Sequence, residues 1–319
     1  MSADPDGGQT RGAILPCGHE VLDANQVHYC TYVSIRSLEA LGHPFAEDPA
    51  RVRMALVEDE TLFVTVHQIA ELALGQSARA FRLAQEALAA DLESRSFAEG
   101  VLQARRGALF LKSSLGAFNP LLTLRQFAVF REHLAPASGA ESLNMRRIEL
   151  LVALRAETPY VEERGTVYTY RAFLDRAPGP GPNDPRTRWW TDELSALAAQ
   201  PSIWERLVTK LDERALTIED VYRITHDPEC GAPAQRAACT ALRPLCNVLA
   251  DFETIYGSWR KQHVHTATQQ IGDLPGTGHT SGAPYLRQVS ETLRLFPGLR
   301  EAAQRERAQA ALPADSKAW

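Results

Sequence analysis

The chain has 319 residues, of which 34 are Lys or Arg and 39 are Asp or Glu, so its formal net charge is -5 at pH 7. This balance argues against a nucleic-acid partner, because polyanions are bound by concentrated positive charge. No apolar run approaches the roughly 18 residues of a membrane span, and the N-terminal stretch lacks the pattern of a secretion signal. The five cysteines contain no CxxC pair, which favours reduced thiols. We therefore expect a cytoplasmic protein.

The pattern along the chain predicts a single all-α domain. Residues 1–20 are polar, Gly-rich and without hydrophobic period, which is typical of a flexible tail, and the domain is expected over residues 21–319. Prolines and glycines alternate over 176–185, which predicts a surface loop. The helical patterns lie at 28–41, 62–111 (one long helix or a hairpin of two), 124–134, 142–157, 191–197, 203–211, 218–224 and 238–271. Strand-type alternation is nearly absent.

A stripe of apolar and aromatic residues in the last of these segments leads to a histidine. Residues three or four positions apart share one side of a helix, and this spacing connects Leu245, Leu249, Phe252, Tyr256, Trp259, His263 and Ala267. His263 should therefore face the core, whereas His265 should point to roughly the opposite side. A buried imidazole needs a partner, which is either a carbonyl or hydroxyl group or a metal ion.

A second histidine, His67, lies in the segment LFVTVHQIAEL and shares a helix face with Phe63. Glu71 follows His67 by one turn, so the two side chains are either a pair of metal ligands or a core histidine beside an unrelated acid. The Glu-x-x-His pattern of di-iron bundles, the HExxH pattern of zinc peptidases and the GxSxG pattern of serine hydrolases do not occur. Those three chemistries are not predicted.

Two further segments carry groups that suit a polar ligand. Arg131 follows Phe127 by one turn, and a guanidinium beside aromatic rings suits capture of a carboxylate, although a surface ion pair with Glu132 is the alternative. The segment Gly272–Gly282 is rich in glycines and hydroxyl groups, so it either wraps a polar ligand or forms a plain surface loop. It lacks the GK[ST] ending of a phosphate-binding loop.

Taken together, the segments DETLFVTVHQIAEL, FREHLAPASGAESL and WRKQHVHTATQQIGDLPGTGHTSGAPYL resemble, in order, three signature blocks of tryptophan 2,3-dioxygenases. The segment YCTYV at 29–33 resembles the tyrosine-bearing N-terminal helix of that family. The resemblance spans residues 28–290 and is weak across 158–240. It implies a helical bundle that encloses haem b, with iron as the metal, and a homotetramer whose active sites lie between subunits.

The resemblance also implies roles for individual residues. His263 would be the proximal ligand of the haem iron, and His67 would be the catalytic histidine on the distal side, close to the indole N–H of the substrate. Arg131 would bind the substrate carboxylate, and Thr277 would hold its ammonium group. The remaining substrate contacts would come from Phe63, Phe127, Ser138 and Gly139, and from Tyr29, Tyr32 and Val33 of a neighbouring subunit.

The activity that the resemblance implies is addition of O2 at the indole C2–C3 bond of L-tryptophan or a close derivative, giving an N-formylkynurenine-type product. Departures from the family pattern suggest a specialised member: Ala73 replaces a tryptophan, Phe127 replaces a tyrosine, and the glycine loop carries His279. The alternative is a monooxygenase of secondary metabolism that converts a modified tryptophan into a 2-oxindole or hydroxylated product. A haem sensor without turnover and a helical interaction protein without cofactor are further alternatives, and Arg131 and Thr277 favour catalysis over the sensor.

Overall fold

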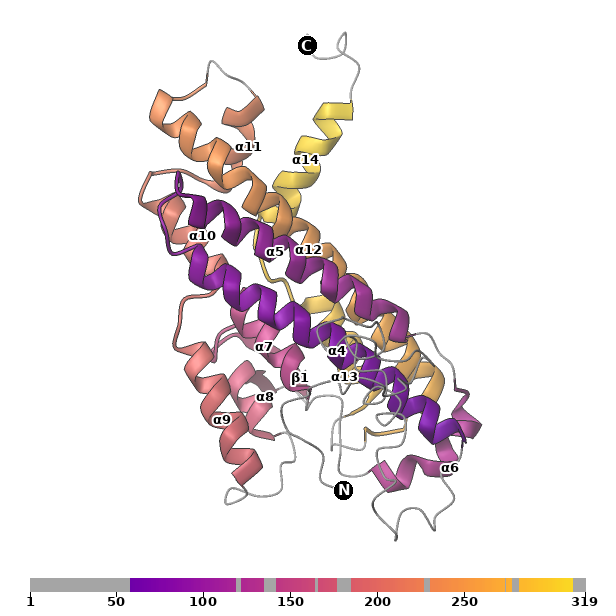
Figure 1. Cartoon of the computed structure of the whole chain (residues 1–319). Helices are drawn as coiled ribbons and strands as arrows, with labels where there is room; N and C mark the ends of the chain where they lie inside the picture. Colours follow the sequence, from indigo (N-terminus) through magenta and orange to yellow (C-terminus); the bar gives the residue numbers. More distant parts are fainter. Residues whose placement is uncertain are drawn as a thin grey trace, which may run out of the picture. The chain divides into compact units, whose positions relative to one another are not determined.

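The computed structural model describes residues 58–118, 122–134, 142–163, 166–176, 185–226, 230–272, 274–276 and 281–311 (Figure 1). The chain divides into two compact units, residues 1–68 and residues 69–319. In the first unit, only the beginning of helix α4, residues 58–68, is described. The predicted tail at 1–20 and the predicted helix at 28–41 lie outside the described residues.

The long helical pattern at 62–111 is a hairpin of two helices, α4 (Glu58–Ala87) and α5 (Arg95–Ser113). Ser94 begins α5 by accepting a hydrogen bond from the backbone N–H of Phe97 at 3.1 Å. The two helices approach closely at Gly107, where a Cβ atom would lie 2.8 Å from the ring of Phe81. Ser77 Oγ adds a hydrogen bond to the Gly107 carbonyl at 2.8 Å. Glycine at 107 therefore allows the contact that closes the hairpin.

The centre of the second unit is α12 (Pro233–Ile271), a helix of 39 residues that runs beside α5 (Figure 1). Its apolar stripe packs on the hairpin, and the rings of Phe81 and Phe252 meet edge to face with their centroids 5.1 Å apart. The helix begins five residues before the predicted start because Pro233 is tolerated in the first turn, where its missing N–H has no helical partner.

The remaining helices of the described residues are shorter. They are the 3-10 helix η1 (Ser114–Phe118), α6 (Leu124–Leu134), α7 (Leu143–Val152), α8 (Tyr170–Arg176), α9 (Pro185–Ala198), α10 (Ile203–Asp212), α11 (Ile218–His226), α13 (Ala283–Thr292) and α14 (Leu299–Ala311). Of these, η1, α6, α11, α13 and α14 contact α12. α6 begins and ends at the residues predicted from the sequence. No helix in the described part of the chain is both long and apolar enough to cross a bilayer.

The structure corrects the sequence prediction in several places. The helix predicted over 142–157 ends at Val152, and a short antiparallel hairpin follows, made of β1 (Pro159–Glu163) and β2 (Thr166–Thr169). α9 begins at Pro185 rather than at 191, and α13 and α14 were not anticipated. Residues 177–184 of the predicted loop lie outside the described residues. Apart from β1 and β2, the regular elements of the described residues are helices, which agrees with the predicted all-α fold.

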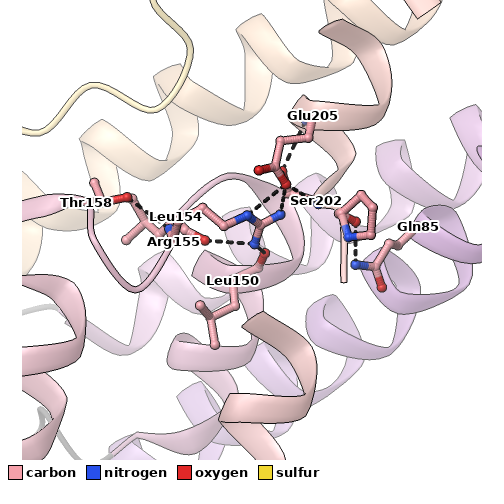
Figure 2. Close-up of polar contacts among 8 residues, drawn as sticks. Gln85, Leu150, Leu154, Arg155, Thr158, Ser202 and Glu205 are labelled. Atoms are coloured by element: carbon pink, nitrogen blue, oxygen red, sulfur yellow. Dashed lines mark hydrogen bonds and ion pairs between the residues drawn. The ribbon is translucent and has the colours of Figure 1, made fainter. Parts of the chain in front are cut away.

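An ion pair holds the segment after α7 to the start of α10 (Figure 2). Arg155 Nε donates to Glu205 Oε2 at 2.7 Å, and Arg155 Nη1 donates to the backbone carbonyls of Leu150 and Leu154. Glu205 also caps α10, because its carboxylate accepts the Ser202 N–H at 2.8 Å. The hydrogen bonds from Arg155 lower the pKa of Glu205 to about 2, which opposes the effect of burial.

Glu205→Gln is therefore expected to lower the free energy of unfolding by about 1 kcal/mol at pH 7, because the pair is partly exposed to solvent. A carboxylate whose pKa is depressed in the folded state stabilises the fold above its unfolded pKa near 4.5, and this contribution disappears as the pH falls toward 2. Urea titrations at decreasing pH should show the difference between wild type and variant shrinking below pH 4.5.

The matched control is Glu86→Gln, which removes an exposed pair with Arg82 and should change stability by only a few tenths of a kcal/mol. A difference between wild type and Glu205→Gln that stays constant as the pH falls would contradict the role assigned to this carboxylate.

Candidate functional site

His263 lies near the C-terminal end of α12, where the helix becomes less buried. The stripe that leads to it is buried as far as Trp259, which is 8% exposed, whereas Thr266 is the one buried residue among 261–271. His263 is half-buried and His265 is exposed. The prediction that the two histidines occupy different sides of the helix is therefore confirmed.

The ring of Trp259 packs against His263. Their ring centroids are 5.2 Å apart and their planes are inclined by 62°. Trp259 is in turn held by η1, because its Nε1 donates to Ser114 Oγ at 3.1 Å. Ser114 is fully buried, and its hydroxyl donates to the Leu111 carbonyl of α5 at 2.7 Å. A chain of contacts thus links the end of α5 to the imidazole.

The carboxylate of Glu149, which the sequence analysis did not single out, is buried and joins the helices α7, α8 and α12. Its partners on α12 precede His263 in the chain. Glu149 of α7 is 1% exposed and accepts hydrogen bonds from the hydroxyl groups of Tyr170, at 2.7 Å, and Tyr256. Two guanidinium groups flank it: Arg146 Nη1 lies 2.9 Å from one carboxylate oxygen, and Arg260 Nη2 lies 3.1 Å from the other. These five side chains, with Tyr160, form what we call the Glu149 cluster.

Electrostatics keep Tyr170 and Arg146 of the Glu149 cluster in their protonated forms. Burial raises the pKa of Tyr170 well above its usual value, and the Glu149 carboxylate raises it further, so the hydroxyl stays a donor. Burial lowers the pKa of Arg146, but the Glu149 carboxylate and the neighbouring tyrosines together raise it above its usual value. Tyr160 accepts from both arginines, at 3.2 and 3.0 Å. The cluster thus places two cations around one anion and fixes α7 against α12.

Arg131 of α6 lies beside the loop that follows α12. Its Nη2 donates to the Pro275 carbonyl, and its Nε is buried without a hydrogen-bond partner among the described residues. Phe127, one turn earlier, is 5% exposed and meets Phe130 edge to face at 5.2 Å. Pro275 precedes Thr277 by two residues. The structure therefore brings the predicted carboxylate-binding residue to the edge of the predicted glycine loop.

In the first unit, His67 is exposed and its ring lies against that of Phe63, with centroids 4.2 Å apart. His67 Nδ1 lies 2.7 Å from the Phe63 carbonyl oxygen. A neutral ring in this arrangement carries its proton on Nδ1, so Nε2 holds the lone pair. The contact between the two predicted site residues is local to one turn of α4.

Glu71 has a structural role at the start of α7. Its carboxylate accepts hydrogen bonds from Ser142 Oγ and from Asn144 Nδ2, the latter at 2.8 Å. Ser142 is the residue that caps α7, so Glu71 holds the start of α7 on α4. In the described part of the chain, no three or more His, Cys, Asp or Glu side chains gather into a set that could hold a bare metal ion.

Several predicted site residues lie outside the described residues, namely Tyr29, Tyr32, Val33, Ser138, Gly139 and Thr277, as does His279 of the glycine loop. Ala73, which departs from the family pattern, is described and half-buried. A signal for the missed Glu149 cluster was present in the sequence, since Arg146 and Glu149 lie three residues apart in a segment that also carries the apolar residues Ile148 and Leu150.

Known proteins with similar sequences belong to one family. A family model described as tryptophan 2,3-dioxygenase matches residues 16–174. A tryptophan 2,3-dioxygenase of Bradyrhizobium sp. strain BTAi1 is 30% identical over 78% of this chain and 85% of its own length. A tryptophan 2,3-dioxygenase of Anaeromyxobacter sp. strain K is 27% identical over 85% of this chain and 93% of its own length. Because the relative that is 30% identical is matched over most of both chains, this chain belongs to the tryptophan 2,3-dioxygenase family.

Proposed function

We propose that this protein is a haem-dependent oxygenase that adds O2-derived oxygen at the C2–C3 bond of the indole ring of L-tryptophan or a close derivative. Membership of the family carries the proposal, since the relatives it matches are named tryptophan 2,3-dioxygenases. The half-buried His263, at the end of an aromatic stripe on α12, is the residue that we assign to the iron.

The chemistry of the candidate residues fits haem b. A porphyrin supplies most of the iron's ligands itself, so a single imidazole from the protein suffices, whereas a bare metal ion needs several side chains. His263 offers such an imidazole, packed against the ring of Trp259. When bound, haem would supply the iron that activates O2.

Arg131 is proposed to bind the carboxylate of the amino acid. The guanidinium already contacts the loop after α12 through Pro275, and its buried Nε keeps a donor that a carboxylate oxygen would satisfy. Phe127 presents a ring one turn away, where the family pattern has a tyrosine. Thr277, Ser138 and Gly139 would complete the polar contacts. Such a clamp acts by orientation, because it fixes the indole ring before reaction.

His67 is proposed to act on the distal side, with Phe63 packed on the indole. The hydrogen bond between His67 Nδ1 and the Phe63 carbonyl would leave Nε2 as an acceptor for the indole N–H. We further propose that the chain forms a cytoplasmic homotetramer, in which Tyr29, Tyr32 and Val33 of one subunit enter the active site of its neighbour.

The test is a spectrum followed by a turnover assay. Purified protein reconstituted with haem should show a Soret band, and the reduced protein should consume O2 only when tryptophan or a derivative is added. A Soret band without amino-acid-dependent O2 uptake would favour the sensor alternative, and absence of the band would overturn the proposal.

Arg131→Leu is expected to weaken tryptophan binding by about 1.5–3 kcal/mol, the usual worth of hydrogen bonds to a charged group. Tryptamine, which lacks the carboxylate, should bind wild type and variant equally. The measurement is calorimetric or spectroscopic titration of each ligand, with Arg125→Leu as a control, because Arg125 is exposed on the same helix. An equal loss of affinity for tryptophan and tryptamine would rule out a carboxylate clamp.

A further inference from the structure

The orientation of the His263 ring depends on what packs against it. Rotation about the bond between the Cβ atom and the ring of a histidine is broad, so the backbone of α12 alone does not determine where the ring nitrogens point. The Glu149 cluster fixes the backbone of α12 through Tyr256 and Arg260. Neither of these contacts restrains the His263 ring directly.

Trp259 does contact the ring. It lies one turn before His263, its ring centroid is 5.2 Å away, and the two planes are inclined by 62°. An indole fixed in this position excludes the imidazole rotations that would bring the two rings into collision. The position of Trp259 therefore limits the orientations that His263 can adopt.

The indole is itself fixed by one serine. Ser114 is 0% exposed, and its single hydroxyl proton is used in the 2.7 Å hydrogen bond to the Leu111 carbonyl. Its oxygen is therefore an acceptor toward Trp259 Nε1, at 3.1 Å. Trp259 Nε1 therefore donates to Ser114, and Ser114 donates to the backbone of α5. These two hydrogen bonds restrain the orientation of the indole.

We propose that Trp259 and Ser114 are positioning residues for His263: Ser114 orients the indole, and the indole orients the imidazole so that one ring nitrogen is directed at the haem iron. The inference rests on the proposed function, in which His263 ligates the iron. Replacing a residue that orients a metal-bound histidine typically lowers metal affinity by about 10- to 100-fold.

The test compares two buried serines. Ser114→Ala removes the acceptor for Trp259, and Trp259→Phe keeps a ring but removes the donor. Ser77→Ala is the matched control, because Ser77 is also 0% exposed and also donates to a backbone carbonyl of α5, that of Gly107 at 2.8 Å. All variants are reconstituted with haem, and haem transfer to excess apomyoglobin gives the dissociation rate.

Ser114→Ala and Trp259→Phe should each release haem about 10-fold faster than wild type, the lower end of the range for residues that orient a metal ligand. The double variant should match the single ones, since all of them break the same hydrogen bond. Ser77→Ala should release haem at the wild-type rate. The vibrational frequency of the iron–histidine bond in the ferrous protein should shift in the first three variants alone.

In the haem-free protein, the ring nitrogen resonances of His263, observed with labelled histidine, should change in Ser114→Ala and stay unchanged in Ser77→Ala. Equal haem release by the two serine variants, or an unchanged iron–histidine frequency in Ser114→Ala, would overturn the inference while leaving the proposed function intact. A wild-type chain that binds no haem would overturn both.

Discussion

Replacing His263 by alanine is expected to abolish stoichiometric haem binding, whereas His265→Ala should retain about one haem per chain. The two residues lie two positions apart on α12, but His263 is half-buried against Trp259 and His265 is exposed. Only His263 is therefore placed to ligate a haem enclosed by the protein. Haem content is measured as Soret absorbance per mole of chain after reconstitution and gel filtration.

The control in this experiment is internal, because the two variants remove the same side chain from the same helix. Circular dichroism of both should match the wild type in the absence of haem. Equal retention of haem by the two variants would show that another residue ligates the iron.

Glu149→Gln is expected to lower the free energy of unfolding by about 3–5 kcal/mol, because it leaves two buried guanidinium groups without their carboxylate. Arg146 and Arg260 are 5% and 8% exposed, so water cannot replace the lost charge. The substitution keeps the size of the side chain, which excludes a cavity as the cause. The measurement is urea unfolding of the haem-free protein.

Glu193→Gln is the matched control, since Glu193 pairs with Arg147 of the same helix α7 but its side chain is 30% exposed. Its loss should cost about 1 kcal/mol or less. Comparable losses for the two variants would mean that the Glu149 cluster stabilises the protein no more than a surface ion pair.

Much of the helical framework could be predicted from the sequence because its elements are long and periodic. The stripe that ends at His263 occupies one side of α12, and the hairpin of α4 and α5 was one of two predicted alternatives. The β1–β2 hairpin was missed because its strands are only five and four residues long, too short for alternation to be recognised.

The site was predicted only in part, for a different physical reason. The position of His263 on its helix follows from local spacing, and the aromatic neighbours of Arg131 suggested a carboxylate site. The roles of His67 and Thr277 came from the family resemblance alone. Ser114 and Glu149 were missed because their function lies in contacts more than 100 residues apart in sequence, with Trp259 and Arg260. No local pattern specifies such pairs, and charged residues are ordinarily expected at the surface.

The most direct measurement of the central claim is the mass of the product formed from L-tryptophan, and from methylated tryptophans, under oxygen-18 gas. The proposed dioxygenase reaction predicts two labelled oxygen atoms in an N-formylkynurenine-type product of the wild-type enzyme. A single labelled atom in every product would contradict the dioxygenase activity and establish the monooxygenase alternative.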